Sequence, residues 1–232
     1  TSDRKRVSGC VAKEEKTGKT KEIIANHVIL ASGGIAGDLK RVRKLWDKSL
    51  GTPPDVILNG SHHYALGDMH DAVQKMNGKL VHQEKMWNYA AGVHHPAGDK
   101  DFHGLSLVPP KSALWMNYEG KRIGPIPLIT GFDTKYLVEE ICKQKKKYSW
   151  QVLNWKIATT ELAVSGSEYN EAVRDKKIFQ FLKQVRFGNK KLVEDLTSNC
   201  IDFVVANSLP ELVEKMNRLN KDNSVRLEFL EK

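Results

Sequence analysis

Val28-Ile29-Leu30-Ala31-Ser32-Gly33-Gly34 is the stretch in which the fold can be read most directly. The run is short, β-branched and closed by two glycines, which is typical of a strand buried on both faces of a sheet, and we predict that strand over 27–31. Glycine has no side chain, so another backbone or a ligand can approach the strand end closely. Ligands of open α/β sheets bind at such carboxyl ends. A plain turn at Gly33-Gly34 stays open as an alternative.

The composition around this strand is that of a folded protein. Hydrophobic residues make up 40% and charged residues 28% of the 232 residues, which excludes a disordered chain. Three cysteines are too few for a disulfide scaffold, so we expect reduced thiols and a cytoplasmic location. No run of ~18 apolar residues occurs, so we expect no membrane span. The chain opens with Thr-Ser-Asp-Arg-Lys-Arg and has no initiator Met, so we expect a fragment of a longer protein.

The net charge of +9 raises the alternative of a nucleic-acid-binding domain. The densest basic runs are 40–44 and 143–147. No nucleic-acid motif accompanies them, and solvated helix faces explain them equally well. We therefore expect no nucleic-acid partner.

Periodicity and turn residues predict a mixture of helices and short strands. A hairpin is expected over 7–26 with its turn at 16–19, a helix over 38–46 capped by Asp38, and a helix over 68–77 that ends at Gly78 as its C′ residue. Thr134 and Ser208 are expected to cap two later helices. The other predicted helices cover 155–164, 171–186 and 190–197, and the other predicted strands cover 80–81, 93–94, 112–117, 148–153 and 203–206.

Histidine and tryptophan are concentrated in the middle of the chain. Seven of the eight His lie between residues 62 and 103, but no HxxxH or CxxC pair accompanies them, so we expect no metal. Histidine is the side chain best suited to polarise a carbonyl or move a proton near neutral pH. Four of the five Trp lie between residues 87 and 155, where they form either the wall of an apolar substrate site or part of the core.

The order of four short motifs resembles the fumarate reductase/succinate dehydrogenase flavoprotein superfamily, and more closely its ketosteroid-dehydrogenase-like group. The family signatures are strand-Ala-Thr-Gly-Gly, Gly-Asp-Gly, His-Pro-Thr and Gly-Lys-Arg. The likeness extends over about residues 7–220, including the later stretches Ser149–Asn154 and Asp202–Ala206. The matching motifs are Ile29–Gly34, Ala65–Met69, Val93–Pro96 and Asn117–Arg122.

The resemblance implies a two-domain FAD enzyme of α+β class. Residues 1–35 would be the terminal piece of a Rossmann-like FAD domain, residues 36–220 a capping domain of helices and small sheets, and residues 221–232 a tail. The Gly-x-Gly-x-x-Gly fingerprint is absent here. We therefore expect FAD binding and activity to need the remainder of the FAD domain as a partner.

The resemblance also implies roles for individual residues. Ser32, Gly33 and Gly34 would lie near the nucleotide part of FAD, and Gly67 and Asp68 would approach the flavin ring. The residues implied at the substrate are His94 and His95, of which one would polarise a carbonyl or relay a proton, Tyr89 as a second group for that role, and Pro96 and Arg122 as contacts.

Departures from the family pattern bear on the substrate. Met69 stands where the second Gly is expected, and Ala97 replaces the Thr of His-Pro-Thr. The Glu and Arg that clamp a dicarboxylate are not apparent in 124–128 or 151–156, so an apolar carbonyl compound fits better than fumarate. We expect dehydrogenation or reduction of a carbon–carbon bond next to a carbonyl, by proton transfer and hydride transfer to or from FAD. A non-catalytic interaction module with a cap-like fold is the alternative.

Overall fold

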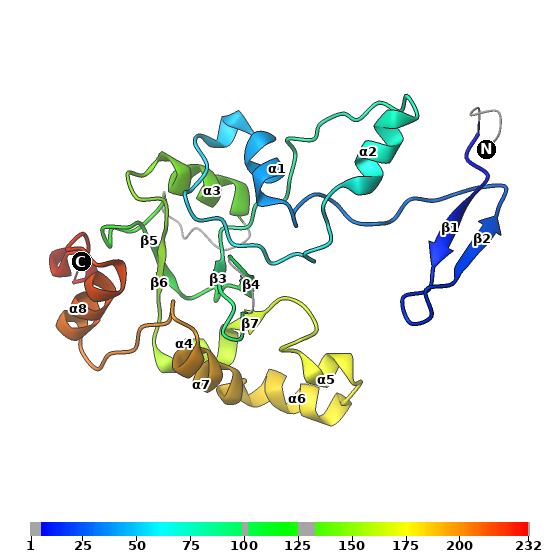
Figure 1. Ribbon diagram of the computed structural model, residues 1–232. Helices are drawn as coiled ribbons and strands as arrows, with labels where there is room; N and C mark the ends of the chain where they lie inside the picture. Colours follow the sequence, from blue (N-terminus) through cyan, green and yellow to red (C-terminus); the bar gives the residue numbers. More distant parts are fainter. Residues whose placement is uncertain (1–5, 99–101, 125–132, 232) are drawn as a thin grey trace.

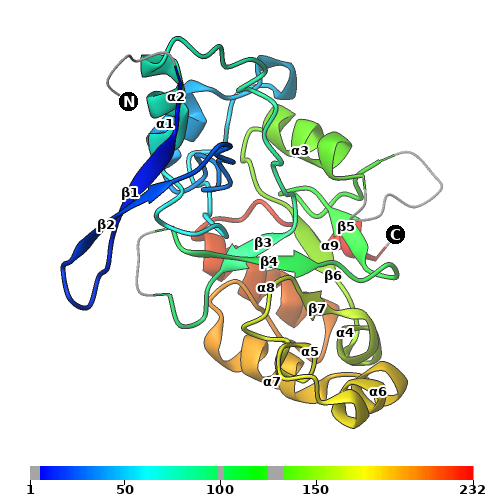
Figure 2. The ribbon, with the colours of Figure 1, turned by 90° about the vertical axis from the view of Figure 1, so that its right-hand side faces the viewer.

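The computed structural model describes residues 6–98, 102–124 and 133–231, and it combines helices with small antiparallel sheets (Figures 1 and 2). The predicted α+β class is confirmed at this level. The sequence argument against a dicarboxylate clamp used residues 124–128 and 151–156, and residues 125–128 lie outside the described ranges. Within the described ranges, no helix combines the length and the apolar character needed to cross a bilayer.

The predicted N-terminal hairpin is present. Strands β1 (Gly9–Lys13) and β2 (Thr20–Ile24) pair antiparallel, with Gly9 opposite Ile24. Gly18 has a φ of 68°, a conformation that glycine adopts without strain and that the turn requires. The hairpin extends away from the rest of the molecule (Figure 1), and every residue of β2 is exposed.

The predicted buried strand over 27–31 is not formed, and this part of the prediction is wrong for the described chain. Residues 27–34 have no regular structure, and Ile29 and Leu30 are 89% and 49% exposed. A strand exists only where a neighbour accepts its ladder of hydrogen bonds. No strand of the described ranges runs beside this stretch. Its apolar side chains consequently have no sheet in which to be buried, and no Rossmann-like piece forms here.

Two small sheets form the centre of the molecule. Strands β3 (Gly92–His94), β4 (Gly104–Val108) and β7 (Ala163–Val164) make one sheet, and β5 (Leu114–Met116) with β6 (Trp150–Val152) makes the other. His94 lies opposite Gly104, and Trp115 opposite Gln151. The strands predicted around 93–94, 112–117 and 148–153 are therefore confirmed. Those predicted at 80–81 and 203–206 are not strands, and β4 was not predicted.

Three helices bury the main core against these sheets. They are α3 (Thr134–Lys143), α4 (Trp155–Glu161) and α7 (Lys190–Asn199). Leu137 of α3 and Leu196 of α7 are fully buried, and Val193 is 1% exposed. Burying each such side chain contributes about 1.5–3 kcal/mol. The apolar spacing that predicted these helices is thus the spacing that fills the core.

Two of the predicted helix caps are formed as expected. The Asp38 carboxylate accepts hydrogen bonds from the amides of Lys40 and Arg41 and begins α1 (Leu39–Lys44), which a 3-10 turn, η1 (Lys48–Leu50), follows. The Ser208 hydroxyl accepts from the Glu211 amide and begins α8 (Leu209–Asn220). These bonds satisfy amides that a helix start leaves without partners.

At two other helix ends, the end of α2 and the start of α3, the structure differs from the prediction. At the end of α2 (Asp68–Lys75), Asn77 rather than Gly78 has the positive φ, 63°. Gly78 instead allows close contact, because a Cβ there would lie 2.4 Å from Val73 Cγ1. The predicted cap Thr134 does not cap α3: its hydroxyl donates to the Asn88 carbonyl and accepts from the Ala90 amide. It therefore fastens α3 to the segment in front of β3.

The helix predicted over 171–186 is split into α5 (Glu171–Arg174) and α6 (Ile178–Phe187), because Lys176 adopts a φ of 55°. The predicted polar tail is in fact packed. Val225 is 3% exposed, and the Arg226 amide donates to the Glu119 carbonyl ahead of α9 (Leu227–Leu230).

Candidate functional site

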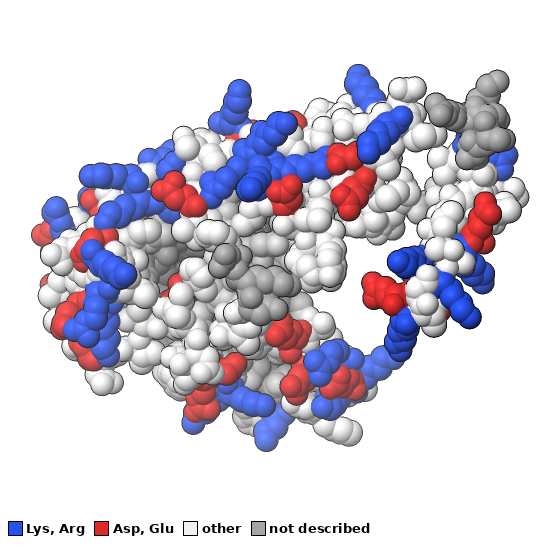
Figure 3. All heavy atoms as spheres, viewed as in Figure 1, with Lys and Arg blue, Asp and Glu red and all other residues white. Residues whose placement is uncertain are grey.

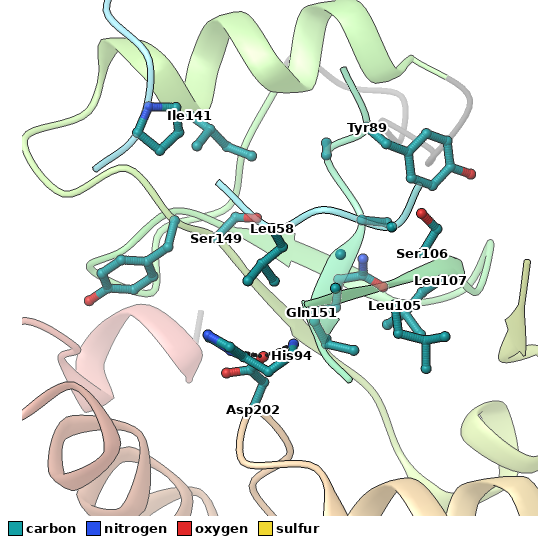
Figure 4. Close-up of a pocket in the computed structure, with 18 of the residues that line it drawn as sticks. Leu58, Tyr89, His94, Leu105, Ser106, Leu107, Ile141, Ser149, Gln151 and Asp202 are labelled. Carbon is teal, nitrogen blue, oxygen red and sulfur yellow. Dashed lines mark hydrogen bonds and ion pairs between the residues drawn. The ribbon is translucent and has the colours of Figure 1, made fainter. Parts of the chain in front are cut away.

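A large cavity lies between the two central sheets, helix α3 and the segment 201–209 that joins α7 to α8 (Figure 4). Its volume is about 2570 Å³. Sites for small molecules are commonly about 300–1,000 Å³. The cavity therefore has room for more than one small ligand, or for a ligand as long as a dinucleotide together with a second molecule.

The wall of this cavity is mostly apolar with a few polar groups. Aliphatic surface comes from three different segments, with Leu58, Leu105, Leu107 and Ile141, and Figure 4 shows these residues around one space. The polar side chains on the wall include Ser106, Ser149, Gln151, His94 and Asp202. An apolar wall with a small number of placed polar groups is the usual composition of a small-molecule site.

His94 and Asp202 form a hydrogen-bonded pair on this wall. His94 Nδ1 lies 2.8 Å from Asp202 Oδ2, and their side chains are 38% and 27% exposed. A carboxylate can only accept, so the proton of the neutral imidazole is on Nδ1 and the lone pair is on Nε2. A histidine held in this way can take up or return a proton at Nε2.

Both chain segments of the pair are fixed by further bonds. The same Asp202 oxygen accepts from the His94 backbone amide, and Cys200 Sγ donates to the His94 carbonyl over 3.1 Å. Burial raises the pKa of the Cys200 thiol to about 11, so it keeps its proton and remains a donor. Because α7 ends at Asn199, residues 200–202 lie at its C-terminal end and reach β3. The helix end and the strand thereby hold the pair in one geometry.

Gly34 and Tyr89 also line the cavity. A Cβ added at Gly34 would meet nothing within 4 Å, so its backbone is open to a ligand. Ser32 and Gly33 precede it in the exposed segment and do not line the cavity. Figure 4 shows Tyr89 across the cavity from His94 with its hydroxyl turned away, so the structure does not bring the two together.

His95 is separated from His94, and the prediction that both face one ligand is corrected. The His95 side chain is only 4% exposed and does not line the cavity. Its Nδ1 accepts from the Ala97 amide and its Nε2 lies 3.1 Å from Glu168 Oε2, while its ring stacks on His103 at 4.3 Å. Adjacent residues of a strand point to opposite faces, so only one of the two can reach the cavity.

The remaining predicted site residues lie elsewhere. Gly67, buried with a φ of 86°, begins α2, and Asp68 is the first residue of that helix. Pro96 is half-buried beside His95, and Arg122 is exposed after the turn that follows β5. None of these four residues lines the cavity.

The sequence interpretation missed the polar partners of the site. Asp202 was noted only as the start of a family-like stretch, and Gln151 only within another. Asp202 and His94 are 108 residues apart, so no local spacing connects them. The sequence signal that could have pointed to Asp202 is its position, as an acidic residue directly before the apolar run 203–206 and just after the predicted helix over 190–197.

Two buried donors on cavity-lining residues have no hydrogen-bond partner within the described part of the chain. They are Asn88 Nδ2 and Trp150 Nε1. Leaving a buried donor unpaired costs about 1–3 kcal/mol, so this wall is suited to a ligand with acceptor groups. Residues 6–98, 102–124 and 133–231 contain no cluster of three or more His, Cys, Asp or Glu that could hold a metal ion.

Comparison with known proteins gives one family and several relatives. The profile of the FAD binding domain family matches residues 1–222. A KsdD-like steroid dehydrogenase of Mycolicibacterium smegmatis is 34% identical over 209 residues, and one of Mycobacterium tuberculosis is 37% identical over 212 residues. These alignments cover 90% and 91% of this chain but only 38% and 37% of the relatives. The chain thus spans little more than a third of their length. No solved structure gives a significant match.

Proposed function

The chain belongs to the FAD binding domain family, and on that premise we propose that it forms the substrate-facing part of a flavin-dependent dehydrogenase or reductase. The reaction is proton and hydride transfer across a carbon–carbon bond next to a carbonyl. The cavity that holds the His94–Asp202 pair together with Gly34 is the observation that carries this proposal.

The residues on the cavity wall fit the cofactor of this family. Gly34 offers backbone without a side chain. Asn88 Nδ2 and Trp150 Nε1 are buried donors that have no hydrogen-bond partner within the described part of the chain. In the complete site, Ser32 and Gly33 would continue this contact along the nucleotide, and Gly67 and Asp68 would approach from the start of α2. When bound, FAD supplies the group that takes up or returns the hydride.

His94 is the proton-transfer residue in this proposal. Its Nε2 takes the proton from the carbon next to the carbonyl during dehydrogenation, and it returns that proton during reduction. Asp202 is a positioning residue, because it keeps the second proton on Nδ1 and so keeps the Nε2 lone pair available. Because the apolar wall excludes water, it strengthens both the contact of Nε2 with the substrate and the hydrogen bond from Nδ1 to Asp202.

The substrate class follows from the wall. Leucine and isoleucine side chains line the space drawn in Figure 4, the polar groups Ser106 and Gln151 are uncharged, and Asp202 is paired with His94. An apolar carbonyl compound suits this surface, and a steroid ketone of the kind that the relatives' names indicate is one such compound. The exposed Arg122 and the half-buried Pro96 take part only if the complete protein brings them nearer.

We further propose that residues 36–220 are a capping domain and that residues 1–35 complete a Rossmann-like FAD domain. The 89% exposure of Ile29 supports this, because an apolar run without a sheet is what a strand shows when its neighbours are missing. The remainder of the FAD domain is the partner that would supply them.

The test is expression of the natural protein that contains this sequence. We expect a yellow preparation whose flavin is bleached by an uncharged ketosteroid, or by its reduced form, but not by fumarate or succinate. A colourless preparation that added FAD cannot reconstitute would sink the proposal. It would favour the interaction module instead.

A further inference from the structure

Helix α6 exposes almost all of its apolar surface. It has no buried residue, whereas α3 and α7, of the same ten-residue length, bury four and three residues. Phe179 is 90% exposed and Phe187 71%. A contiguous apolar surface left in water is a common sign of an interaction site.

The apolar residues of α6 follow one face of the helix. Ile178, Phe181, Leu182 and Val185 have the i, i+3, i+4, i+7 spacing of a single stripe, and they are 67%, 43%, 55% and 68% exposed. In α3 and α7 the corresponding stripe packs into the core. In α6 all four residues remain exposed, and we call them the α6 stripe.

The segment around the α6 stripe is strongly basic. Residues 174–191 contain seven Lys or Arg against one Asp, which is an excess of six positive charges in a chain whose net charge is +9. Arg174 and Lys177 both pair with Asp175, the single carboxylate. Figure 3 shows Lys and Arg side chains, with some Asp and Glu among them, next to uncharged ones along the lower edge of the molecule, where α5 and α6 lie in Figure 1.

We propose that α6 binds the surface of an anionic lipid membrane, with the α6 stripe in the boundary between headgroups and acyl chains and the basic residues against the lipid phosphates. Interfacial helices combine Phe and Leu on one side with Lys and Arg around them. With ten residues, α6 is far too short to span the bilayer, so it lies on the surface.

The positive charge around α6 favours an anionic membrane over two other binding partners, a second copy of the chain and a nucleic acid. A second copy of the chain would bring two sets of the same positive charges together, which is unfavourable. A nucleic acid would satisfy the charges but would leave the α6 stripe in water. An anionic bilayer satisfies both features at once. This inference does not rest on the proposed function, because no residue of α6 lines the cavity.

The test is sedimentation of the purified natural protein with vesicles at low and high salt. Vesicles of phosphatidylcholine containing phosphatidylglycerol should sediment it, and vesicles of phosphatidylcholine alone should not. Each basic residue near an anionic leaflet contributes about 1 kcal/mol, so Lys183→Gln should weaken partitioning about fivefold. Val185→Ser, a substitution within the α6 stripe, should weaken it further at all salt concentrations.

Matched controls are Lys16→Gln and Val11→Ser, which change exposed residues of the hairpin and should leave partitioning unchanged. Hydrogen exchange gives a second readout that needs no variant, because vesicles should protect amides 178–187. The proposal is overturned if the wild type ignores the anionic lipid or if the controls lose as much binding as the α6 variants. A change from oligomer to monomer in Val185→Ser, without lipid binding, would assign the α6 stripe to a second copy instead.

Discussion

Replacement of Asp202 by asparagine should slow the proton step without greatly weakening the fold. One Asp202 oxygen accepts from both the His94 amide and Nδ1, 2.8 Å away, so an asparagine oxygen in the same place can keep both bonds and the tautomer. The amide is uncharged, however, and it stabilises the imidazolium that forms when Nε2 takes up the substrate proton less than the carboxylate does. The charge that Asp202→Asn removes is the one that would favour proton uptake at Nε2.

The expected size of this effect follows from the difference between a hydrogen bond to a charged group and one to a neutral group, about 1–1.4 kcal/mol in the barrier, or about five- to tenfold in rate. We expect kcat to fall by that factor, KM to change little, and exchange of the substrate α-hydrogen with deuterated solvent to slow equally. Only about 1 kcal/mol of stability should be lost, because one hydrogen bond is replaced at a half-exposed site.

Glu168→Gln is the matched control, because Glu168 makes the same kind of contact to His95, 3.1 Å, outside the cavity. It should leave kcat and exchange unchanged. The reasoning is refuted if Glu168→Gln slows the reaction as much as Asp202→Asn does. It is equally refuted if Asp202→Asn keeps kcat within about twofold of the wild type, short of the factor that the charge of the acceptor contributes.

Three further predictions concern stability, measured as the free energy of unfolding in denaturant. Leu137→Ala should cost about 2–5 kcal/mol, because the side chain is fully buried in the core. Ser208→Ala should cost about 1 kcal/mol through loss of the cap on the Glu211 amide. Burial raises the pKa of Tyr148 to about 12, while an unfolded tyrosine ionises near pH 10. The unfolded state therefore loses its proton first, so stability should fall between pH 10 and 12, and Tyr148→Phe should remove that part of the fall.

Local structure was predictable wherever its cause lies within a few residues. Asp38 and Ser208 cap helices because their side chains bond amides two or three positions ahead. The hairpin formed because a glycine at its turn accepts a positive φ. The split between α5 and α6 escaped prediction, because the apolar periodicity continues across it and only the backbone of Lys176 interrupts the helix.

Part of the candidate site could be predicted from the sequence in the same way. The glycine pair and the two adjacent histidines were recognised from their residue types, but nothing local distinguishes His94 from His95. Their separation comes from the end of strand β3, where His94 is the last strand residue and lines the cavity, while His95 follows the strand and is buried. Asp202 joined the site only when α7 packed against the sheets.

Sequence alone therefore established the α+β class, most helix positions, the hairpin and the family, because each depends on residue types that are near in the chain or recur in a set order. Tertiary contacts alone selected His94, paired it with Asp202 and left α6 uncovered, because those outcomes require surfaces more than a hundred residues apart, or the absence of a covering surface. The segment 27–31 illustrates the same dependence on tertiary contacts. Its apolar pattern is that of a strand, but it stays exposed because no neighbouring strand of the described residues pairs with it.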